Sequence, residues 1–279
     1  MNTALLKQPN RKKLILKILF IGDIVGKVGR RMIKDKVPYF VKKYDIDFVI
    51  ANGENATHGK GLIRHHYDEL IDAGVDGVTL GNHFNSKNEI NRYIDGADYL
   101  IRPLNLRYDF PGEGSALYDV DGVSIRVTNI LGSAFMTEDV VNPYLRTLEL
   151  LEEAEPATIH IIDFHAEATG EKLSYAYALD GKVSAVLGTH THVQTNDARI
   201  LPKGTAFITD VGMCGEYDSV LGFETNSVVD KTIYGFEAKF QLHDEGKGLF
   251  SAVVIDIDEV TGLAKDIFSI YYVEGEENR

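Results

Sequence analysis

Cysteine is scarce in this sequence and tryptophan is absent. The 279 residues include one cysteine, Cys214, and no tryptophan. A single cysteine has no intrachain partner, so the chain cannot rely on a disulfide framework, and this usage fits a reducing cytosol better than an oxidising compartment. Neither a nucleophilic cysteine signature nor a Gly-x-Ser-x-Gly motif is present. We therefore expect a cytoplasmic protein without acyl-enzyme chemistry, in which Cys214 is an ordinary loop thiol.

The sequence also lacks a long apolar run. Basic residues at 11–13 precede the apolar stretch Leu14–Ile21, as in a secretory signal, but Lys17 interrupts that stretch and no small-residue cleavage site follows it. A membrane-spanning helix needs about 20 predominantly apolar residues, and no stretch approaches that length. We expect a soluble protein with no membrane partner.

Positive charge is in short supply. Lysine and arginine number 29 against 42 aspartates and glutamates, which gives a formal net charge of -13. This balance argues against a broad basic surface for nonspecific nucleic-acid binding. An anionic substrate would have to be attracted locally, and bound cations are one way to do so within an acidic protein.

The chain shows no repeat, low-complexity segment or linker that would divide it. With 44% hydrophobic residues it can bury an ample core. We predict a single domain over residues 1–279. Residues 1–13 would form an N-terminal extension and residues 274–279 an acidic tail, both frayed.

The first two thirds of the chain alternate short apolar runs with helical patterns, which is typical of strands joined by crossover helices. The later sequence predicts a hairpin around Asp121-Gly122 and antiparallel strands from Gly235 on, so we expect an α/β fold with mixed sheets. The predicted crossover strands are Leu14–Ile21, Asp47–Ala51, Gly77–Leu80, Thr158–Phe164, Ala185–Gly188 and Ala206–Thr209.

Helical spacing of apolar residues predicts one helix around residues 33–41 and another around residues 145–151. Pro38 is expected to kink or split the first of these. Ser86 with Glu89 has the spacing of a capping box, which predicts the start of a further helix.

Polar clusters follow five of the predicted strands directly. Functional side chains of α/β proteins gather at the carboxyl ends of strands, so the clusters are expected to converge. Histidine, asparagine and carboxylates suit first-row divalent ions, and a preceding glycine allows close backbone approach. The clusters are Gly22-Asp23, Gly53-Glu54-Asn55, Gly81-Asn82-His83, Asp163-Phe164-His165 and Gly188-Thr189-His190-Thr191-His192.

The order of these clusters resembles the calcineurin-like metallophosphoesterase superfamily, whose motifs run Asp, bridging acid, Gly-Asn-His, His and Gly-x-His-x-His. Gly-Asp-Ile-Val-Gly, Asn-Gly-Glu-Asn and Gly-Asn-His-Phe are similar to its YmdB-type branch of bacterial cyclic-nucleotide phosphodiesterases. The motif match runs from Asp23 to His192, and the similarity covers nearly the whole chain.

This resemblance implies a four-layer α/β/β/α sandwich with two mixed sheets, and a centre of two divalent ions, iron or manganese with zinc as an alternative. His83 would not be a ligand but would protonate the leaving oxygen as a general acid. The implied ligands are Asp23 and His192 for the first ion, Asn82, His165 and His190 for the second, and Glu54 as the bridge.

Three positions depart from the superfamily pattern. Val25 stands where most members have a histidine ligand, and we expect Asn55 to replace it. Glu54 takes the place of a bridging aspartate. Phe84 takes the place of a carboxylate after Gly-Asn-His, which leaves open what orients His83.

Two divalent ions about 4 Å apart can share a hydroxide and align an in-line displacement. A histidine acid adds a factor of about 10²–10⁴. We therefore predict hydrolysis of a small phosphodiester, a 2′,3′- or 3′,5′-cyclic nucleotide. Two alternative functions stay open: a phosphomonoesterase or protein phosphatase on the same centre, and a non-catalytic nucleotide-responsive regulator. The sequence also leaves open whether the protein forms a homo-oligomer.

Five histidines lie outside the clusters. His65 and His66 are adjacent in a predicted helix, where neighbours point in different directions, so we interpret them as a solvated helix face. His58 is either a substrate-contacting or a plain loop residue. We expect structural roles for His160 and His243.

Overall fold

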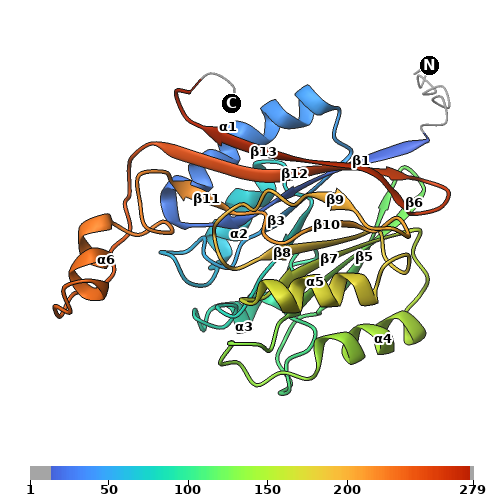
Figure 1. Ribbon diagram of the computed structural model, residues 1–279, viewed down its shortest axis with the longest axis horizontal. Helices are drawn as coiled ribbons and strands as arrows, with labels where there is room; N and C mark the ends of the chain where they lie inside the picture. The colour runs from blue at the N-terminus through green and yellow to red at the C-terminus, as the bar shows by residue number, and fades with distance from the viewer. Residues whose placement is uncertain (1–13, 277–279) are drawn as a thin grey trace, which may run out of the picture.

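The computed structural model describes residues 14–276 (Figure 1). Within that range no helix has the length and apolar character needed to cross a membrane. The predicted extension 1–13 and residues 277–279 lie outside the described residues. The prediction of a frayed acidic tail is wrong for Glu274, because the Glu274 carboxylate accepts hydrogen bonds from the Arg31 guanidinium at 2.7 Å and from the Gly248 amide at 2.9 Å.

The first sheet has seven strands in the described range, in the order β2-β11-β12-β1-β3-β4, with β13 pairing on β12. β1 is parallel to β3, and β3 to β4, whereas β12 runs antiparallel to both β1 and β13, so the sheet is mixed as predicted. The strands are β1 (Ile15–Ile21), β2 (Asp23–Ile24), β3 (Phe48–Asn52), β4 (Gly77–Thr79), β11 (Met213–Glu216), β12 (Gly248–Asp258) and β13 (Ala264–Val273).

The second sheet has six strands in the same range, in the order β5-β6-β7-β8-β10-β9. Its four central strands are parallel, and β5 and β9 close the two edges antiparallel. The predicted turn at Asp121-Gly122 joins β5 to β6, and both residues have a positive φ. The strands are β5 (Ser115–Val120), β6 (Val123–Leu131), β7 (Ile159–His165), β8 (Ala185–Thr189), β9 (Arg199–Ile200) and β10 (Ala206–Ile208).

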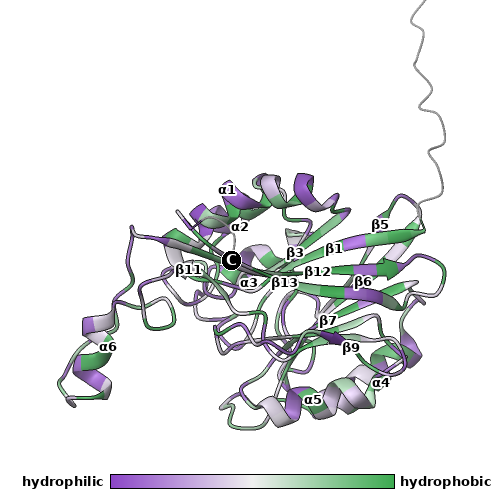
Figure 2. Ribbon diagram, turned by 45° about the horizontal axis from the view of Figure 1, so that its top comes forward, coloured by the Kyte–Doolittle hydropathy of each residue, from purple (hydrophilic) through white to green (hydrophobic). Residues whose placement is uncertain are grey.

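The two sheets lie face to face between helices, which gives the four layers that the family resemblance implies (Figure 2). Helices α1 and α2 cover the first sheet, α4 and α5 cover the second, and α6 projects from the body (Figure 1). The helices are α1 (Gly26–Tyr44), α2 (Arg64–Asp72), α3 (Ile90–Tyr93) with the 3₁₀ turn η1 (Ile94–Gly96), α4 (Pro143–Glu153), α5 (Thr169–Ala178) and α6 (Thr225–Thr232).

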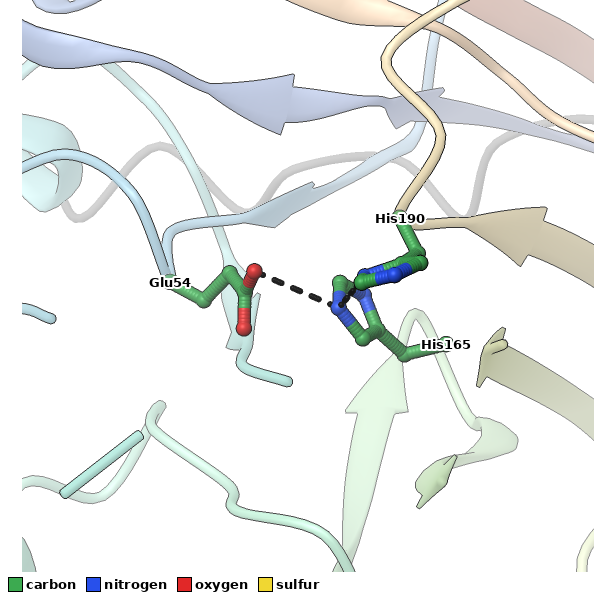
Figure 3. Close-up of side chains that lie close together, drawn as sticks. All are labelled: Glu54, His165 and His190. Atoms are coloured by element: carbon green, nitrogen blue, oxygen red, sulfur yellow. Dashed lines mark hydrogen bonds and ion pairs between the residues drawn. The ribbon is translucent and has the colours of Figure 1, made fainter. Parts of the chain in front are cut away.

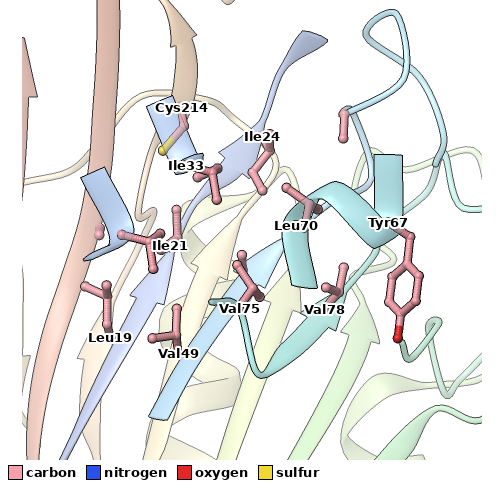
Figure 4. Packing of buried hydrophobic residues seen from close by; sticks show 14 of the residues in the cluster. Leu19, Ile21, Ile24, Ile33, Val49, Tyr67, Leu70, Val75, Val78 and Cys214 are labelled. Carbon is pink, nitrogen blue, oxygen red and sulfur yellow. The ribbon is translucent and has the colours of Figure 1, made fainter. Parts of the chain in front are cut away.

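The alternation of side chains along β1 shows how the layers are held together. Ile18 and Phe20 are fully buried between the two sheets, while Leu19 and Ile21 are fully buried against the helices of the first sheet (Figure 4). Successive residues of a strand face opposite sides, so the unbroken apolar run from Ile18 to Ile21 indicates a strand covered on both faces. Each such side chain contributes about 1.5–3 kcal/mol on burial.

Three local predictions are wrong in whole or in part. Helix α1 runs through Pro38 without a break, so the predicted split at Pro38 is wrong. The further helix is observed as α3, but the capping box is wrong: Glu89 is the N-cap and makes no side-chain capping bond, and its carboxylate accepts from the Arg64 amide at 3.0 Å. Cys214 is not in a loop but in β11, fully buried, where burial raises the pKa of its thiol. The bond between Glu89 and Arg64 and the burial of Cys214 in β11 depend on residues distant in the sequence, which local patterns do not contain.

Candidate metal centre

The predicted ligands meet where the carboxyl ends of strands from both sheets come together. Asp23 follows β1, Glu54 and Asn55 follow β3, and Asn82 follows β4. The histidines come from the second sheet: His165 ends β7, and His190 and His192 follow β8. Because parallel strands end at the same edge of a sheet, segments far apart in the sequence supply one site.

Glu54, His165 and His190 form the tightest part of the site, with their ligand atoms all within 4.8 Å of one another (Figure 3). His165 Nε2 lies 3.2 Å from Glu54 Oε1 and 3.1 Å from His190 Nδ1. The side-chain oxygen of Asn82 lies 3.1 Å from the same His165 nitrogen. The structure thus brings the three ligands expected for the second ion next to the expected bridge.

The ligands expected for the first ion lie beside this cluster. Asp23 Oδ1 is 3.9 Å from His192 Nε2, and Asp23 Oδ2 accepts a hydrogen bond from the His190 amide at 3.1 Å. Asn55, the expected replacement at the position of Val25, has its Nδ2 3.1 Å from His192 Nε2 and 3.0 Å from Glu54 Oε1. All seven predicted ligands therefore belong to one site.

The environment of Asp23 Oδ1 indicates that this site can hold cations. This oxygen is buried and has no hydrogen-bond partner, although a buried carboxylate oxygen without a partner is costly. A cation among these ligands would satisfy it. Carboxylate, amide and imidazole donors together suit manganese, iron or zinc, so the residues fit a pair of divalent ions.

Burial and neighbouring charge set the protonation of the ligands. Burial opposes ionisation of Glu54, but the nearby His165 holds the Glu54 pKa well below its usual range. Burial disfavours the charged form of His165 too, yet Glu54 and Asp23 raise the His165 pKa to about 9. Burial and His165 lower the pKa of His190 to about 3. His165 must therefore release a proton to bind a cation, whereas His190 is already neutral.

The loop after β8 holds its two histidines in unusual backbone conformations. His190 has φ of 103° and His192 has φ of 66°, a region that is strained for non-glycine residues and is found at functional sites. His192 Nδ1 donates to the Leu221 carbonyl at 3.1 Å. Because a carbonyl only accepts, Nδ1 must be the donor in that bond, and Nε2 of His192 faces Asp23 and the Asn55 amide.

His83 stands at the rim, with 27% of its side chain exposed. Its Nδ1 donates to Asn55 Oδ1 at 2.8 Å, and its backbone amide donates to Glu54 Oε2 at 3.0 Å. The sequence left the orienting group of His83 open, and these two contacts supply it. Phe84, at the usual carboxylate position, packs in the core against Phe110.

Gly81 explains why a glycine precedes the Asn82 cluster. A Cβ at this position would lie 2.2 Å from Glu54 Oε2 and 2.5 Å from His165 Nε2. Any side chain would therefore fill the space between these ligands, and only glycine leaves it open.

One residue beside the ligands was not predicted. Glu167, two residues after β7, has its Oε2 3.1 Å from His190 Nε2 and is half exposed. Its position in His165-Ala166-Glu167, just past the strand end, is the signal that sequence reasoning missed.

The remaining histidines lie outside the centre. The prediction of a solvated helix face is wrong for His66, which is buried with its Nδ1 2.8 Å from Thr57 Oγ1, but it holds for His65, whose side chain is 75% exposed. His160 is buried in β7 with its Nε2 2.9 Å from Thr128 Oγ1, which agrees with a structural role. His58 is exposed.

The fold has a counterpart among solved structures. A protein from Staphylococcus aureus assigned as a 5′-nucleotidase matches 94% of this chain and 55% of its own, with a TM-score of 0.61 at 15% identity. That likeness shows the fold alone. It is the calcineurin-like phosphoesterase fold, with two mixed sheets between helices.

The particular family follows from sequence. The model of the YmdB-like protein family matches residues 19–270. The 2′,3′-cyclic-nucleotide 2′-phosphodiesterase of Bacillus subtilis (strain 168) is 47% identical over 253 residues, which cover 90% of this chain and 95% of that protein. A novel phosphatase from Mycoplasma pneumoniae has 38% identity and a TM-score of 0.88, over 93% of this chain and 94% of its own. The chain belongs to the YmdB-like family.

Proposed function

We propose that this protein hydrolyses a small phosphodiester, a cyclic nucleotide, at a centre of two divalent ions. The observation that carries the proposal is the convergence of seven donor residues on one site, in which Asp23 Oδ1 is buried without a hydrogen-bond partner. The named activity of the Bacillus subtilis relative favours a 2′,3′-cyclic nucleotide over a 3′,5′-cyclic one. Family membership supports the broader class of phosphoester hydrolase.

The proposed ligand sets follow the geometry. Asn82, His165 and His190 would hold one ion, Asp23, Asn55 and His192 the other, and Glu54 both. When bound, the two ions supply Lewis acidity and lower the pKa of a coordinated water toward about 7. With Asp23 and Glu54 as the anionic ligands, they leave a formal excess of about two positive charges, which attracts a phosphodiester into an acidic protein.

Asn55 links the ligands to His83. Its nitrogen faces Glu54 and His192, and its oxygen faces His83. As a ligand, Asn55 would turn its amide so that Oδ1 faces the ion, an exchange that leaves the outline of the side chain unchanged. Nδ2 would then donate to Nδ1 of His83. That bond would place the ring proton of His83 on Nε2.

His83 would act as the general acid. Its partial exposure gives a substrate access to the ring, and the nitrogen that does not face Asn55 can approach the leaving oxygen. A ribose alkoxide leaves poorly unless it is protonated, so a positioned histidine proton accelerates the step by about 10²–10⁴-fold.

A phosphomonoesterase or protein phosphatase on the same centre is the second candidate, and the naming of the Mycoplasma pneumoniae relative as a phosphatase favours it. The test is a rate comparison with Mn²⁺-loaded enzyme on 2′,3′-cyclic AMP, 3′,5′-cyclic AMP and p-nitrophenyl phosphate. We expect the highest kcat/KM on 2′,3′-cyclic AMP. A preference for the monoester would replace the proposal with the second candidate, and no turnover on any of the three would favour a non-catalytic regulator.

A further inference from the structure

Asp163 is a buried carboxylate on β7 that belongs to neither ligand set and joins the two sheets. Its Oδ2 accepts a hydrogen bond from Asn52 Nδ2 at 2.9 Å and another from Thr79 Oγ1. Its Oδ1 accepts one from Thr189 Oγ1 at 2.6 Å. Asn52 and Thr79 end β3 and β4 of the first sheet, and Thr189 ends β8 of the second. Asp163 therefore connects the sheets at the edge where the centre lies.

The bond to Thr189 determines which nitrogen of His165 carries a proton. A threonine hydroxyl has one hydrogen to donate, and here it donates to the Asp163 carboxylate, which receives hydrogen bonds on both oxygens. His165 Nδ1 lies 2.8 Å from the same hydroxyl, so the ring must donate and the hydroxyl accept. A ring proton is thereby fixed at Nδ1, so Nε2, which faces Glu54 at 3.2 Å, is the nitrogen that can bind an ion.

Asn52 extends the same network to the other side of the centre. Its Oδ1 accepts from the Glu54 amide at 3.1 Å, and its Nδ2 also donates to the Leu80 carbonyl at 3.0 Å. The first bond holds the loop of the bridging residue, and the second holds the strand end that leads to Asn82. Through Asn52, Asp163 is therefore connected to the backbone of the first sheet next to Glu54 and Asn82.

We propose that Asp163, acting through the Thr189 hydroxyl, is a positioning residue for His165: it holds the ring proton at Nδ1 and presents Nε2 to a divalent ion. This inference rests on the proposed function in one respect, that His165 is a metal ligand. Hydrogen-bonded partners of a metal ligand affect both its orientation and its basicity, and their loss lowers metal affinity about 10–100-fold.

Thr79 offers a matched control for Thr189. Both hydroxyls are fully buried and donate to Asp163, but only the hydroxyl of Thr189 also contacts His165. Valine has nearly the same shape as threonine and lacks the hydroxyl. Thr189→Val and Thr79→Val therefore remove the same kind of bond to Asp163, and only the first removes the link to the ligand.

The experiment titrates Mn²⁺ into metal-free wild type, Thr189→Val, Thr79→Val and Thr189→Ser by calorimetry, with urea unfolding of each metal-free protein alongside. We expect Thr189→Val to weaken one of the two binding events about 10–100-fold, Thr79→Val to change both less than about threefold, and Thr189→Ser to restore the affinity. The two valine variants should shift the urea midpoint to a similar extent.

Equal losses of affinity in the two valine variants would overturn the positioning role, because they would show a general contribution of the network to stability. If wild type binds two ions and Thr189→Val binds them with unchanged affinity, the positioning role is overturned and the metal centre is not. If wild type binds no ion, both the metal centre and the positioning role are overturned.

A second measurement needs no variant, so it holds even if Thr189→Val fails to fold. In ¹⁵N-labelled wild type loaded with Zn²⁺, we expect a slowly exchanging proton on Nδ1 of His165, detected through the ring nitrogen shifts. An Nδ1 of His165 that carries no proton would contradict the proposal.

Discussion

Strand β7 carries a buried histidine at each end, and the two behave in opposite ways. His160, at the start of the strand, faces Thr128, and burial lowers its pKa to about 3. His165, at the end, is fully buried and also contacts a threonine, yet Glu54 and Asp23 raise its pKa to about 9 despite burial. Burial, together with the positive charge of Arg126, keeps the His160 imidazole neutral. The carboxylates at the site edge are what make that edge a place for positive charge.

The largest effect is expected from Glu54→Gln, which removes the charge that distinguishes the site end of β7 and keeps the shape of the side chain. We predict a fall in kcat/KM on 2′,3′-cyclic AMP on the order of 10³-fold or more, because the proposed shared ligand and its charge are lost. The matched control is Asp180→Asn. Asp180 is a buried carboxylate at the opposite end of the second sheet, where it accepts from the Lys203 amide at 2.9 Å.

Asp180→Asn should lower stability but change kcat/KM less than about threefold once folded protein is compared. If the two variants lost kcat/KM to the same extent, removing a buried carboxylate at the site would have no greater effect than removing one elsewhere. The proposed role of Glu54 would then be wrong.

The second effect concerns His83, which lies at the rim of the same edge. We expect His83→Ala to retain its metal content and to lose about 10²-fold or more in kcat on 2′,3′-cyclic AMP. The loss should be far smaller on bis(p-nitrophenyl) phosphate, whose leaving group needs no proton. Parallel assays on both substrates decide the matter, and equal losses would contradict the acid role.

The third effect is a pH dependence of metal binding that follows from the His165 pKa of about 9. Below that pH the metal-free ring holds a proton that must leave before Nε2 can bind an ion. The apparent affinity should therefore rise up to about tenfold per pH unit between pH 7 and 9. His190, with a pKa of about 3, should add nothing to this slope.

Calorimetric titration of Mn²⁺ in buffers of different ionisation enthalpy measures the protons released. Close to one proton per centre at pH 7.5 is the expected result. An affinity that is constant across this range would show that His165 is not a protonated ligand in the metal-free protein.

The smallest effect lies at the other end of β7. The unfolded chain protonates His160 near pH 6.5 and the folded protein only near pH 3, so stability is lost as pH falls between these values. The sign follows because the unfolded state binds more protons in this window. His160→Gln should reduce the slope of unfolding free energy by up to about 1.4 kcal/mol per pH unit between pH 4 and 6. Urea unfolding at several pH values measures it, and an unchanged slope would refute the assignment.

The parts of this fold that sequence predicts are those that depend on local pattern. Each predicted crossover strand lies within one residue of an observed strand, because continuous apolar runs bounded by glycine identify buried strands. The meeting of Asp23 with His192 was also predictable, since both follow carboxyl ends of strands.

What sequence did not predict depends on partners that are distant along the chain. Burial of His66 depends on the Thr57 hydroxyl, and the orientation of His83 on Asn55. The link from Asp163 to Asn52 crosses 111 positions and two sheets. The spacing of apolar residues in the sequence does not predict such pairs, because hydrogen-bond partners in the core are determined by packing between layers.

The most direct test of the central claim is anomalous diffraction from crystals of the wild-type protein grown with Mn²⁺. The prediction is two manganese peaks, both sharing Glu54, one ligated by Asp23 and His192 and the other by His165 and His190. Peaks that lie elsewhere, or none among these side chains, would contradict the claim.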